Sequence, residues 1–399
     1  MIAPPKSRND LLIGIICALP LEYEAVSHVV DEFWDIKLGR AVGDTNTYSF
    51  GRIGDDNVVL VMSGMGKANA ASTAASLHIS FPNLELVLVT GICGGVPGSH
   101  AGSELLLGDV IISKAIVEYD FFPHRHRTKA TIDDRLARPK RHVRSFVCRF
   151  EAERLRDALE ERAAVHLQEL QSRTKGERQG RAGKYQYPGA DKDCLFFPSY
   201  RHKHHSTCDI CTSDSEEVCD ASRHAPCSEI GCEEDQLLSR KRLDQNLELQ
   251  KEGREKEAQA PFVFVGHFGS GDTVLKSGEA RDRLARAHGL IAFEMEGAGV
   301  WDEIPCIIVK GVCDYSDSHK NKGWQDFAAA TAAAVMKALI EEYPKTDKPE
   351  KQKNESSQAS NEESSRTSSD APVFYAEVSK CNIITGFHSS GGTQVINFG

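Results

Sequence analysis

Two short motifs late in the chain carry carboxylates where they could do chemistry. Glu294 and Glu296 flank Met295 in an otherwise apolar segment. Asp314 follows the apolar run at residues 304–311, which is typical of a buried strand. In α/β sheets, ligands bind at the carboxyl ends of such strands. A carboxylate there can accept hydrogen bonds from ligand hydroxyl groups or exchange a proton with a leaving group, and core packing requires neither.

Each motif has a functional and a plain interpretation. On a strand, Glu294 and Glu296 would point to the same face, where a diol on a ligand would offset the cost of burying two like charges. The alternative is a charged pair at an exposed strand end. The apolar neighbours of Asp314 favour its protonated form, which could protonate a purine leaving group at a ring nitrogen. The alternative is an aspartate in a turn or an N-cap.

Earlier segments offer further candidates. Glu22 lies at a predicted helix start, where it could position or activate a water, or simply be favoured by the helix dipole. Glycines after two apolar runs, among them Gly66, Gly91 and Gly94, let a backbone approach a ligand closely or serve ordinary tight turns. Their spacing matches neither a P-loop nor a dinucleotide fingerprint.

The elements that must position these residues alternate between strand and helix. Apolar runs typical of strands occupy residues 11–18, 58–62, 84–89, 109–113, 261–266, 291–297 and 304–311, and Ala-rich helical segments occupy residues 67–78 and 326–343. This order predicts an α/β domain at residues 11–343 with a mainly parallel sheet covered on both sides.

The alternation stops in three places. Residues 121–260 are charged and weakly periodic, which predicts an insertion with one long helix near residues 145–173. Residues 344–372 are almost free of apolar side chains and predict a disordered linker. Residues 373–399 form a short β-prone motif that cannot bury a core of its own.

Composition narrows the class of protein. The net charge of −10 argues against a dedicated nucleic-acid binder. No apolar stretch approaches the roughly 20 residues that span a membrane, and the N-terminal residues lack a signal-peptide core, so a cytoplasmic location is expected. In that compartment the 12 cysteines are expected to be reduced thiols or metal ligands.

The insertion carries the best candidates for metal ligands. Cys208 and Cys211 form a close pair, Cys227 and Cys232 form a wider one, and Cys219 and several histidines, His202, His204, His205 and His224, lie nearby. Zinc prefers four Cys or His ligands. One interpretation is a structural zinc site of Cys208, Cys211, Cys227 and Cys232, and the other is reduced or redox-labile thiols. No other cofactor or catalytic metal is expected.

Taken together, the motifs resemble the nucleoside phosphorylase/nucleosidase superfamily, which includes methylthioadenosine/S-adenosylhomocysteine nucleosidase and uridine phosphorylase. The matching pieces are residues 13–19, 63–67, 89–91, 94–95, 269–272, 293–296 and 311–314. The resemblance covers about half of the chain and implies a three-layer α/β fold with a central mixed, mainly parallel sheet and a long insertion. Residues 301–302, 314–322 and 324–325 resemble a fungal subgroup found in receptors of the innate-immunity kind. Similar domains in defence proteins cleave ATP to adenine and ribose triphosphate.

The resemblance also implies roles for individual residues. Glu22 would activate water, and Asp314 would protonate the purine at N7. Glu296 with Met295 would bind the ribose hydroxyls beside Glu294. The rest of the implied site is Gly91 and Gly94 along base and sugar, with Gly66, Lys67 and Leu275. The reaction would pass through an oxocarbenium-like ribosyl transition state.

Two departures from the family pattern bear on the substrate. The phosphorylases bind phosphate through an arginine after the first strand, and residues 19–26 contain none, which favours water as nucleophile. Nucleosidases often have an aromatic residue near the base where this chain has Thr273, Val274 and Leu275. A triphosphate would need basic partners, and the candidates are Lys67, Arg125, Arg127, Lys276 and Lys310.

The expected activity is therefore hydrolysis of a purine nucleoside or nucleotide, with ATP or adenosine favoured. The alternatives are a phosphate-dependent phosphorylase and a catalytically silent ligand-binding or scaffold domain. The resemblance implies a homo-oligomer. Residues 373–399 resemble short amyloid-signalling motifs and could recruit a similar motif, or be a simple tail or a docked strand.

Overall fold

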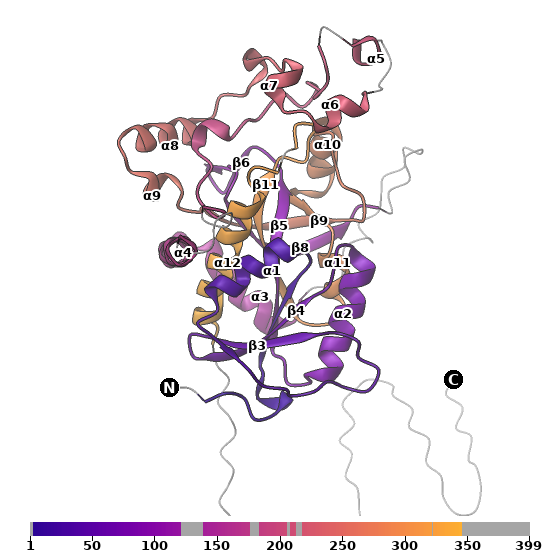
Figure 1. Cartoon of the computed structure of the whole chain (residues 1–399), viewed down its shortest axis with the longest axis vertical. Helices are drawn as coiled ribbons and strands as arrows, with labels where there is room; N and C mark the ends of the chain where they lie inside the picture. The colour runs from indigo at the N-terminus through magenta and orange to yellow at the C-terminus, as the bar shows by residue number, and fades with distance from the viewer. Residues whose placement is uncertain are drawn as a thin grey trace, which may run out of the picture. The chain divides into compact units, whose positions relative to one another are not determined.

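A computed structural model of the chain describes residues 3–120, 139–175, 183–205, 208–212, 218–320 and 322–344. These residues build an α/β domain around one nine-stranded sheet (Figure 1). Its strands are β1 (Ile13–Cys17), β2 (Glu32–Trp34), β3 (Tyr48–Ile53), β4 (Asp56–Met62), β5 (Leu86–Gly95), β8 (Val110–Glu118), β9 (Val263–Ser270), β10 (Leu290–Glu294) and β11 (Cys306–Asp314). β6 (Ser99–His100) and β7 (Ser103–Glu104) pair separately.

The main sheet is mixed, with the strand order β10-β9-β8-β11-β5-β1-β4-β3-β2. The pairs β1–β4, β1–β5, β5–β11, β8–β9 and β9–β10 are parallel. The pairs β2–β3, β3–β4 and β8–β11 are antiparallel, as is a further contact of β10 with β5 through Ala292 and Gly95. That contact closes β5, β11, β8, β9 and β10 into a ring. The predicted mixed, mainly parallel sheet is confirmed.

Helices cover the sheet from two sides, so the predicted three layers are confirmed. α1 (Pro20–Val29), α4 (Glu153–Thr174) and α12 (Gln325–Glu342) pack together, and α2 (Lys67–Ser80) packs against α11 (Gly297–Trp301). In Figure 1, α4 and α12 lie on the left and α2 and α11 on the right. The small side chains of the Ala-rich α12 let the helix approach the sheet closely. The approach is so close that a Cβ atom on Gly311 of β11 would lie 2.0 Å from the Ala328 carbonyl oxygen.

The predicted insertion at residues 121–260 begins with elements of the main domain. The long helix expected near residues 145–173 is present as α4 but begins only at Glu153, because a 3₁₀ turn at Arg149–Glu151 separates it from α3 (Arg141–Cys148). Along α4, Leu159, Ala163 and Leu167 are buried in the same core as the sheet. α4 therefore belongs to a helical layer of the sheet domain rather than to the inserted segment.

The rest of the insertion is built from short helices, α5 (Asp209–Thr212), α6 (Asp220–His224), α7 (Cys227–Ile230), α8 (Lys241–Lys251) and α9 (Glu255–Ala258). In Figure 1, α5, α6 and α7 lie at the top of the view, with α6 next to α10 (Gly278–His288), and α8 and α9 lie at the upper left. The linker and the β-prone motif expected beyond residue 344 lie outside the described residues. No helix in the described part of the chain is long and apolar enough to cross a lipid bilayer.

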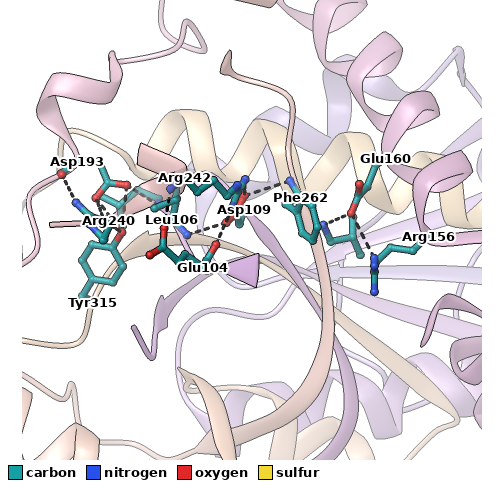
Figure 2. Close-up of polar contacts among 12 residues, drawn as sticks. Glu104, Leu106, Asp109, Arg156, Glu160, Asp193, Arg240, Arg242, Phe262 and Tyr315 are labelled. Atoms are coloured by element: carbon teal, nitrogen blue, oxygen red, sulfur yellow. Dashed lines mark hydrogen bonds and ion pairs between the residues drawn. The ribbon is translucent and has the colours of Figure 1, made fainter. Parts of the chain in front are cut away.

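Polar contacts anchor the insertion to the sheet domain (Figure 2). Arg242 at the start of α8 donates to Asp109, with 2.7 Å between Nη2 and Oδ1. Arg240 donates from Nη1 to Asp193 Oδ1 at 2.8 Å and to the hydroxyl of Tyr315 at 2.6 Å. Arg240, Asp193 and Asp109 are all buried. The insertion is thus held at two places, Asp109 just before β8 and Tyr315 just after β11.

Candidate active site

Glu22 lies against β5 at the end of β1. Pro20 begins α1 directly after that strand, a position that suits the fixed proline φ angle, and Glu22 is in the first turn. Its Oε2 accepts hydrogen bonds from the backbone N–H groups of Ala18 and Leu19, at 2.8 and 2.9 Å, and its Oε1 accepts from Ile92 at 2.8 Å. Burial raises the pKa of Glu22; Lys310 opposes this shift and Glu296 adds to it.

Gly91 makes the position of Glu22 possible. A Cβ atom at Gly91 would lie 2.0 Å from Glu22 Oε1, so any larger residue would displace the carboxylate. The helix-dipole interpretation of Glu22 is therefore incomplete, since the side chain is buried against β5 rather than exposed at the helix start.

Lys310 joins two of the predicted carboxylates. It is a fully buried residue of β11, and its Nζ lies 3.1 Å from Glu296 Oε2 and 3.8 Å from Glu22 Oε1. Burial works against the charge of Lys310, but Glu296 and Glu22 outweigh it and raise the pKa of the ammonium group. Lys310 was considered as a triphosphate partner, and the structure instead places it between two carboxylates.

Glu294 and Glu296 are both buried, so an exposed strand end is wrong. The same-face argument is also wrong, because β10 ends at Glu294 and Glu296 has φ −118° and ψ −33° just before α11. Glu294 Oε2 accepts hydrogen bonds from the backbone of Glu296 and Gly297, at 2.9 and 2.7 Å, and thereby fixes the turn. Glu296 Oε1 faces the N–H of Gly66 at 3.3 Å, and Met295 between the two glutamates is half-buried.

Asp314 is the last residue of β11 and is buried. Its Oδ1 accepts a hydrogen bond from the Ser316 N–H at 2.9 Å, and its Oδ2 lies 2.8 Å from Lys320 Nζ. Gly94 leaves room for this turn, since its Cβ atom would lie 2.9 Å from Asp314 Oδ1 and 2.0 Å from Ser316 Oγ. Lys320 was not predicted: the sequence shows only the apolar neighbours of Asp314.

The register of β5 and β11 sets the distance between the two ends of the site. Lys310 pairs with Gly91, and Asp314 pairs with Gly94. Three residues of a strand span roughly 10 Å. The Glu22–Lys310–Glu296 group and Asp314 are therefore separated by about this distance along the β5–β11 strand pair.

The sequence of this region matches a known family. The family model described as "Phosphorylase superfamily" matches residues 12–176. Over these residues the chain is similar to the phosphorylase superfamily.

Two kinds of relative are similar to parts of the chain. A nucleotide-binding leucine-rich repeat (NLR)-like protein of Hyaloscypha variabilis is 28% identical over 84% of this chain and 30% of its own length. A 5'-methylthioadenosine/S-adenosylhomocysteine nucleosidase of Mycobacterium bovis is 30% identical over 27% of this chain and 38% of its own length. The chain thus spans well under two thirds of either relative.

Solved structures include a nucleosidase of the same name from Neisseria meningitidis in complex with methylthio-immucillin-A. It is 16% identical with a TM-score of 0.45, and the match covers 83% of this chain and 98% of that one.

Two further predicted site residues, Lys67 and Leu275, contact other side chains of the domain. Lys67 begins α2, and its Nζ lies 2.9 Å from Asp120 and 3.3 Å from Glu118, so it is committed to these carboxylates. Leu275 packs against a hydrophobic cluster that includes Tyr119 and Phe293, whose rings meet edge to face at 5.5 Å. Two aromatic residues, Tyr119 just after β8 and Phe293 in β10, thus belong to the hydrophobic cluster against which Leu275 packs.

A basic cavity adjoins Asp314 through Lys320. Its volume is about 780 Å³, and its basic lining residues are Arg201, Arg223, Lys276 and Lys320, with Glu279 as the acidic one. Among the predicted triphosphate partners, Lys276 therefore faces a cavity beside the site. Arg125 and Arg127 lie outside the described residues.

Among the described residues, the cysteines of the insertion lie in two groups rather than in the one group of the zinc interpretation. Cys208 and Cys211 lie with Cys219 and His204, whereas Cys227 and Cys232 lie with His202. Within each group the ligand atoms are all within 4.8 Å of one another. The sequence spacing suggested joining the two cysteine pairs, but each pair is completed by residues close to it in space.

Proposed function

We propose that this domain hydrolyses the N-glycosidic bond of a purine nucleoside or nucleotide. The observation that carries the proposal is the buried ammonium group of Lys310 between Glu22 and Glu296, with Asp314 four residues further along β11. Such hydrolysis needs a base for water, an acceptor for the sugar hydroxyls and an acid for the departing base. The three carboxylates are suited to these tasks by their separation.

In the proposed reaction, water attacks the anomeric carbon while the bond to the purine nitrogen breaks. Glu22 accepts the proton of the water, for which its raised pKa makes it a better base than an ordinary glutamate. Glu296 accepts hydrogen bonds from the ribose hydroxyls and stabilises the oxocarbenium-like transition state. Asp314 delivers a proton to N7, so that the base departs neutral with the electrons of the broken bond. Lys310 holds Glu22 and Glu296 in place.

An anionic substrate is favoured by the basic cavity. Arg201, Arg223, Lys276 and Lys320 line it, and Lys320 also contacts Asp314. Clustered cationic side chains are the usual partners of phosphate groups. ATP is therefore the leading substrate, ahead of adenosine.

Product analysis of the purified full chain tests the proposal. ATP, ADP, AMP, adenosine, guanosine and methylthioadenosine are incubated with and without phosphate, beside an Asp314→Asn variant. Free base that appears without phosphate and is lost in the variant is the expected result. Release only with phosphate would replace hydrolysis by phosphorolysis. Binding without any release would leave a ligand-binding or scaffold domain.

The NLR-like relative suggests where the activity serves. The proposed role is that of a nucleotide-degrading effector in a fungal innate-immunity-like system, acting as a homo-oligomer. Light scattering during turnover tests this part: the base-release rate per chain is expected to rise with the oligomeric fraction. A rate that is independent of oligomeric state would contradict it and leave the hydrolysis untouched.

A further inference from the structure

The part of the insertion that follows the Asp193 anchor lacks a core of its own. From Ser199 to Gln236, the buried residues among those described are His202, Cys211, Ser222 and Ile230. The helices of this stretch, α5, α6 and α7, are one turn long or little more. Segments that bury so little apolar surface are commonly stabilised by a bound metal or by disulfides.

The first group of ligand atoms has the distances of a tetrahedral zinc site. The Nδ1 atom of His204 lies 3.4 Å from Cys219 Sγ and 3.7 Å from Cys211 Sγ. Zinc binds nitrogen at about 2.0–2.1 Å and sulfur at about 2.3 Å, so a tetrahedral angle separates two such ligands by roughly 3.5 Å. Cys208 is the fourth member, and all four ligand atoms lie within 4.8 Å of one another.

The second group has a histidine set up as a metal ligand. The Nε2 of His202 lies 2.9 Å from the carbonyl oxygen of Ala225, which can only accept, so the hydrogen sits on Nε2. The Nδ1 lone pair then faces Cys227 and Cys232, whose Sγ atoms lie 3.5 and 3.6 Å away. One lone pair can accept one hydrogen bond, whereas one metal satisfies both sulfurs. Metal-bound histidines typically donate the hydrogen of the other ring nitrogen to a carbonyl or carboxylate oxygen in this way.

His319 lies beside this second group. Its ring centre is 5.4 Å from that of His202 at an interplanar angle of 80°, and neither of its buried ring nitrogens has a hydrogen-bond partner among the described residues. Two imidazoles on one tetrahedral zinc have ring centres about 5 Å apart, given bonds of about 2.0–2.1 Å. The His319 ring stacks on Phe196 with ring centres 3.9 Å apart, so ligation would require the side chain to rotate out of this stack.

We propose that the insertion binds two zinc ions, the first through His204, Cys208, Cys211 and Cys219 and the second through His202, Cys227, Cys232 and His319. The second ion joins the insertion to the segment after Asp314, where the backbone N–H of His202 also donates to Ser318 Oγ at 2.9 Å. His319 directly precedes Lys320, the salt-bridge partner of Asp314. The second zinc therefore holds Lys320 in place, a consequence that rests on the proposed function.

Metal analysis of the full chain, purified without chelator, tests the proposal independently of any activity. Two zinc ions per chain are expected by elemental analysis. Cys219→Ser and Cys232→Ser should each leave one ion, whereas Cys148→Ser and Cys194→Ser, at exposed cysteines outside both groups, should leave two. His319→Gln should weaken the second ion on the order of 10-fold in competition with a chelator. His205→Gln, a neighbouring histidine outside both groups, should not.

Cobalt substitution covers the case in which a variant fails to fold. Titration of the metal-stripped wild-type protein with Co²⁺ should give thiolate charge-transfer absorption that saturates at two equivalents. Saturation at one equivalent would overturn the second site. Disulfides among the five cysteines in freshly purified protein, with no bound metal, would overturn both.

Discussion

Tyr315 donates its phenolic hydrogen to the carboxylate of Asp193 at 2.8 Å, although 122 positions separate them in the chain. Tyr315 directly follows Asp314, and Asp193 lies in the insertion, where Arg240 also holds it. Figure 2 shows Tyr315, Asp193 and Arg240 together, and all three side chains are buried. The residue proposed to protonate the leaving base is thus attached to the insertion through its neighbour.

Tyr315→Phe should therefore reduce activity as well as stability. Loss of one buried hydrogen bond costs about 1 kcal/mol of unfolding free energy, and we expect base release to fall several-fold because the turn carrying Asp314 loosens. Thermal unfolding and base-release rates measure the two effects. Tyr48→Phe is the matched control, since Tyr48 donates to Asp44 at 2.7 Å from β3. Equal activity losses in both variants would contradict a specific link to Asp314.

Lys310→Met should abolish activity by leaving two buried carboxylates without their shared cation. Removing one partner of a buried pair typically costs about 3–5 kcal/mol of stability, and we expect base release to fall on the order of 100-fold or more. Lys337→Met is the control, because Lys337 is also buried and pairs with a carboxylate, Asp31. Rates are compared at a temperature where circular dichroism shows both variants folded. Lys310→Arg should recover part of the rate, and no recovery would argue for a purely structural lysine.

The pH dependence of the reaction should show Glu22 as its base. Burial raises its pKa above the usual 4.5, and the base works only when ionised. kcat/KM should therefore rise with pH through a pKa above 4.5 and level off once Glu22 has lost its proton. Glu22→Gln should remove this rise along with most of the rate. A Glu22→Gln variant that keeps the wild-type rise with pH would exclude Glu22 from this role.

The sequence predicted the central strands well for a physical reason. β1, β4, β5 and β11 are buried on both faces, which requires continuous apolar runs that stand out in any reading of the chain. β2 and β3 were missed because they are partly exposed and antiparallel, with no such run. The alternation of strands and helices along the chain also predicted where the carboxylates lie, since each follows or ends such a strand.

The contacts within the site were harder to predict. Lys310 sits inside an apolar run, and only the register of β11 against β5 shows that it faces Glu22 and Glu296. The placement of Glu296 on a strand failed because the chain turns after Glu294. The zinc interpretation placed Cys208, Cys211, Cys227 and Cys232 in one site, whereas the structure places the two pairs in separate groups. Sequence spacing does not show how the short helices of the insertion are arranged in space.

Gly91→Ala should impair the site without a general loss of packing. The added Cβ atom would lie 2.0 Å from Glu22 Oε1, so the carboxylate must move away from Lys310 and from the Ile92 N–H. We expect base release to fall at least 10-fold, since displacements of about 1 Å can cost 100-fold. Gly14→Ala in β1 is the control, because its Cβ atom would meet only side chains, at 3.1 Å or more. A Gly91→Ala enzyme with the wild-type rate would contradict the assignment of Glu22.

Glu160 should make the stability of the domain depend on pH. This residue of α4 accepts a hydrogen bond from the Val263 N–H at 2.8 Å, and burial raises its pKa from 4.5 to about 7. Between these values the folded protein holds a proton that the unfolded chain has lost, so stability falls as pH rises and is constant above about 7. Glu160→Gln keeps the acceptor oxygen and removes the titration.

The variant should therefore gain stability relative to wild type between pH 5 and pH 8. One pKa unit corresponds to about 1.4 kcal/mol, and because Glu160 is partly exposed we expect a relative gain of about 1 kcal/mol after screening. Chemical denaturation at the two pH values measures it. Glu161→Gln, on the exposed face of the same helix, controls for general effects of charge on α4. A difference between Glu160→Gln and wild type that stays constant with pH would show that Glu160 is ionised throughout and that Arg156, whose Nε is 3.9 Å away, offsets its burial.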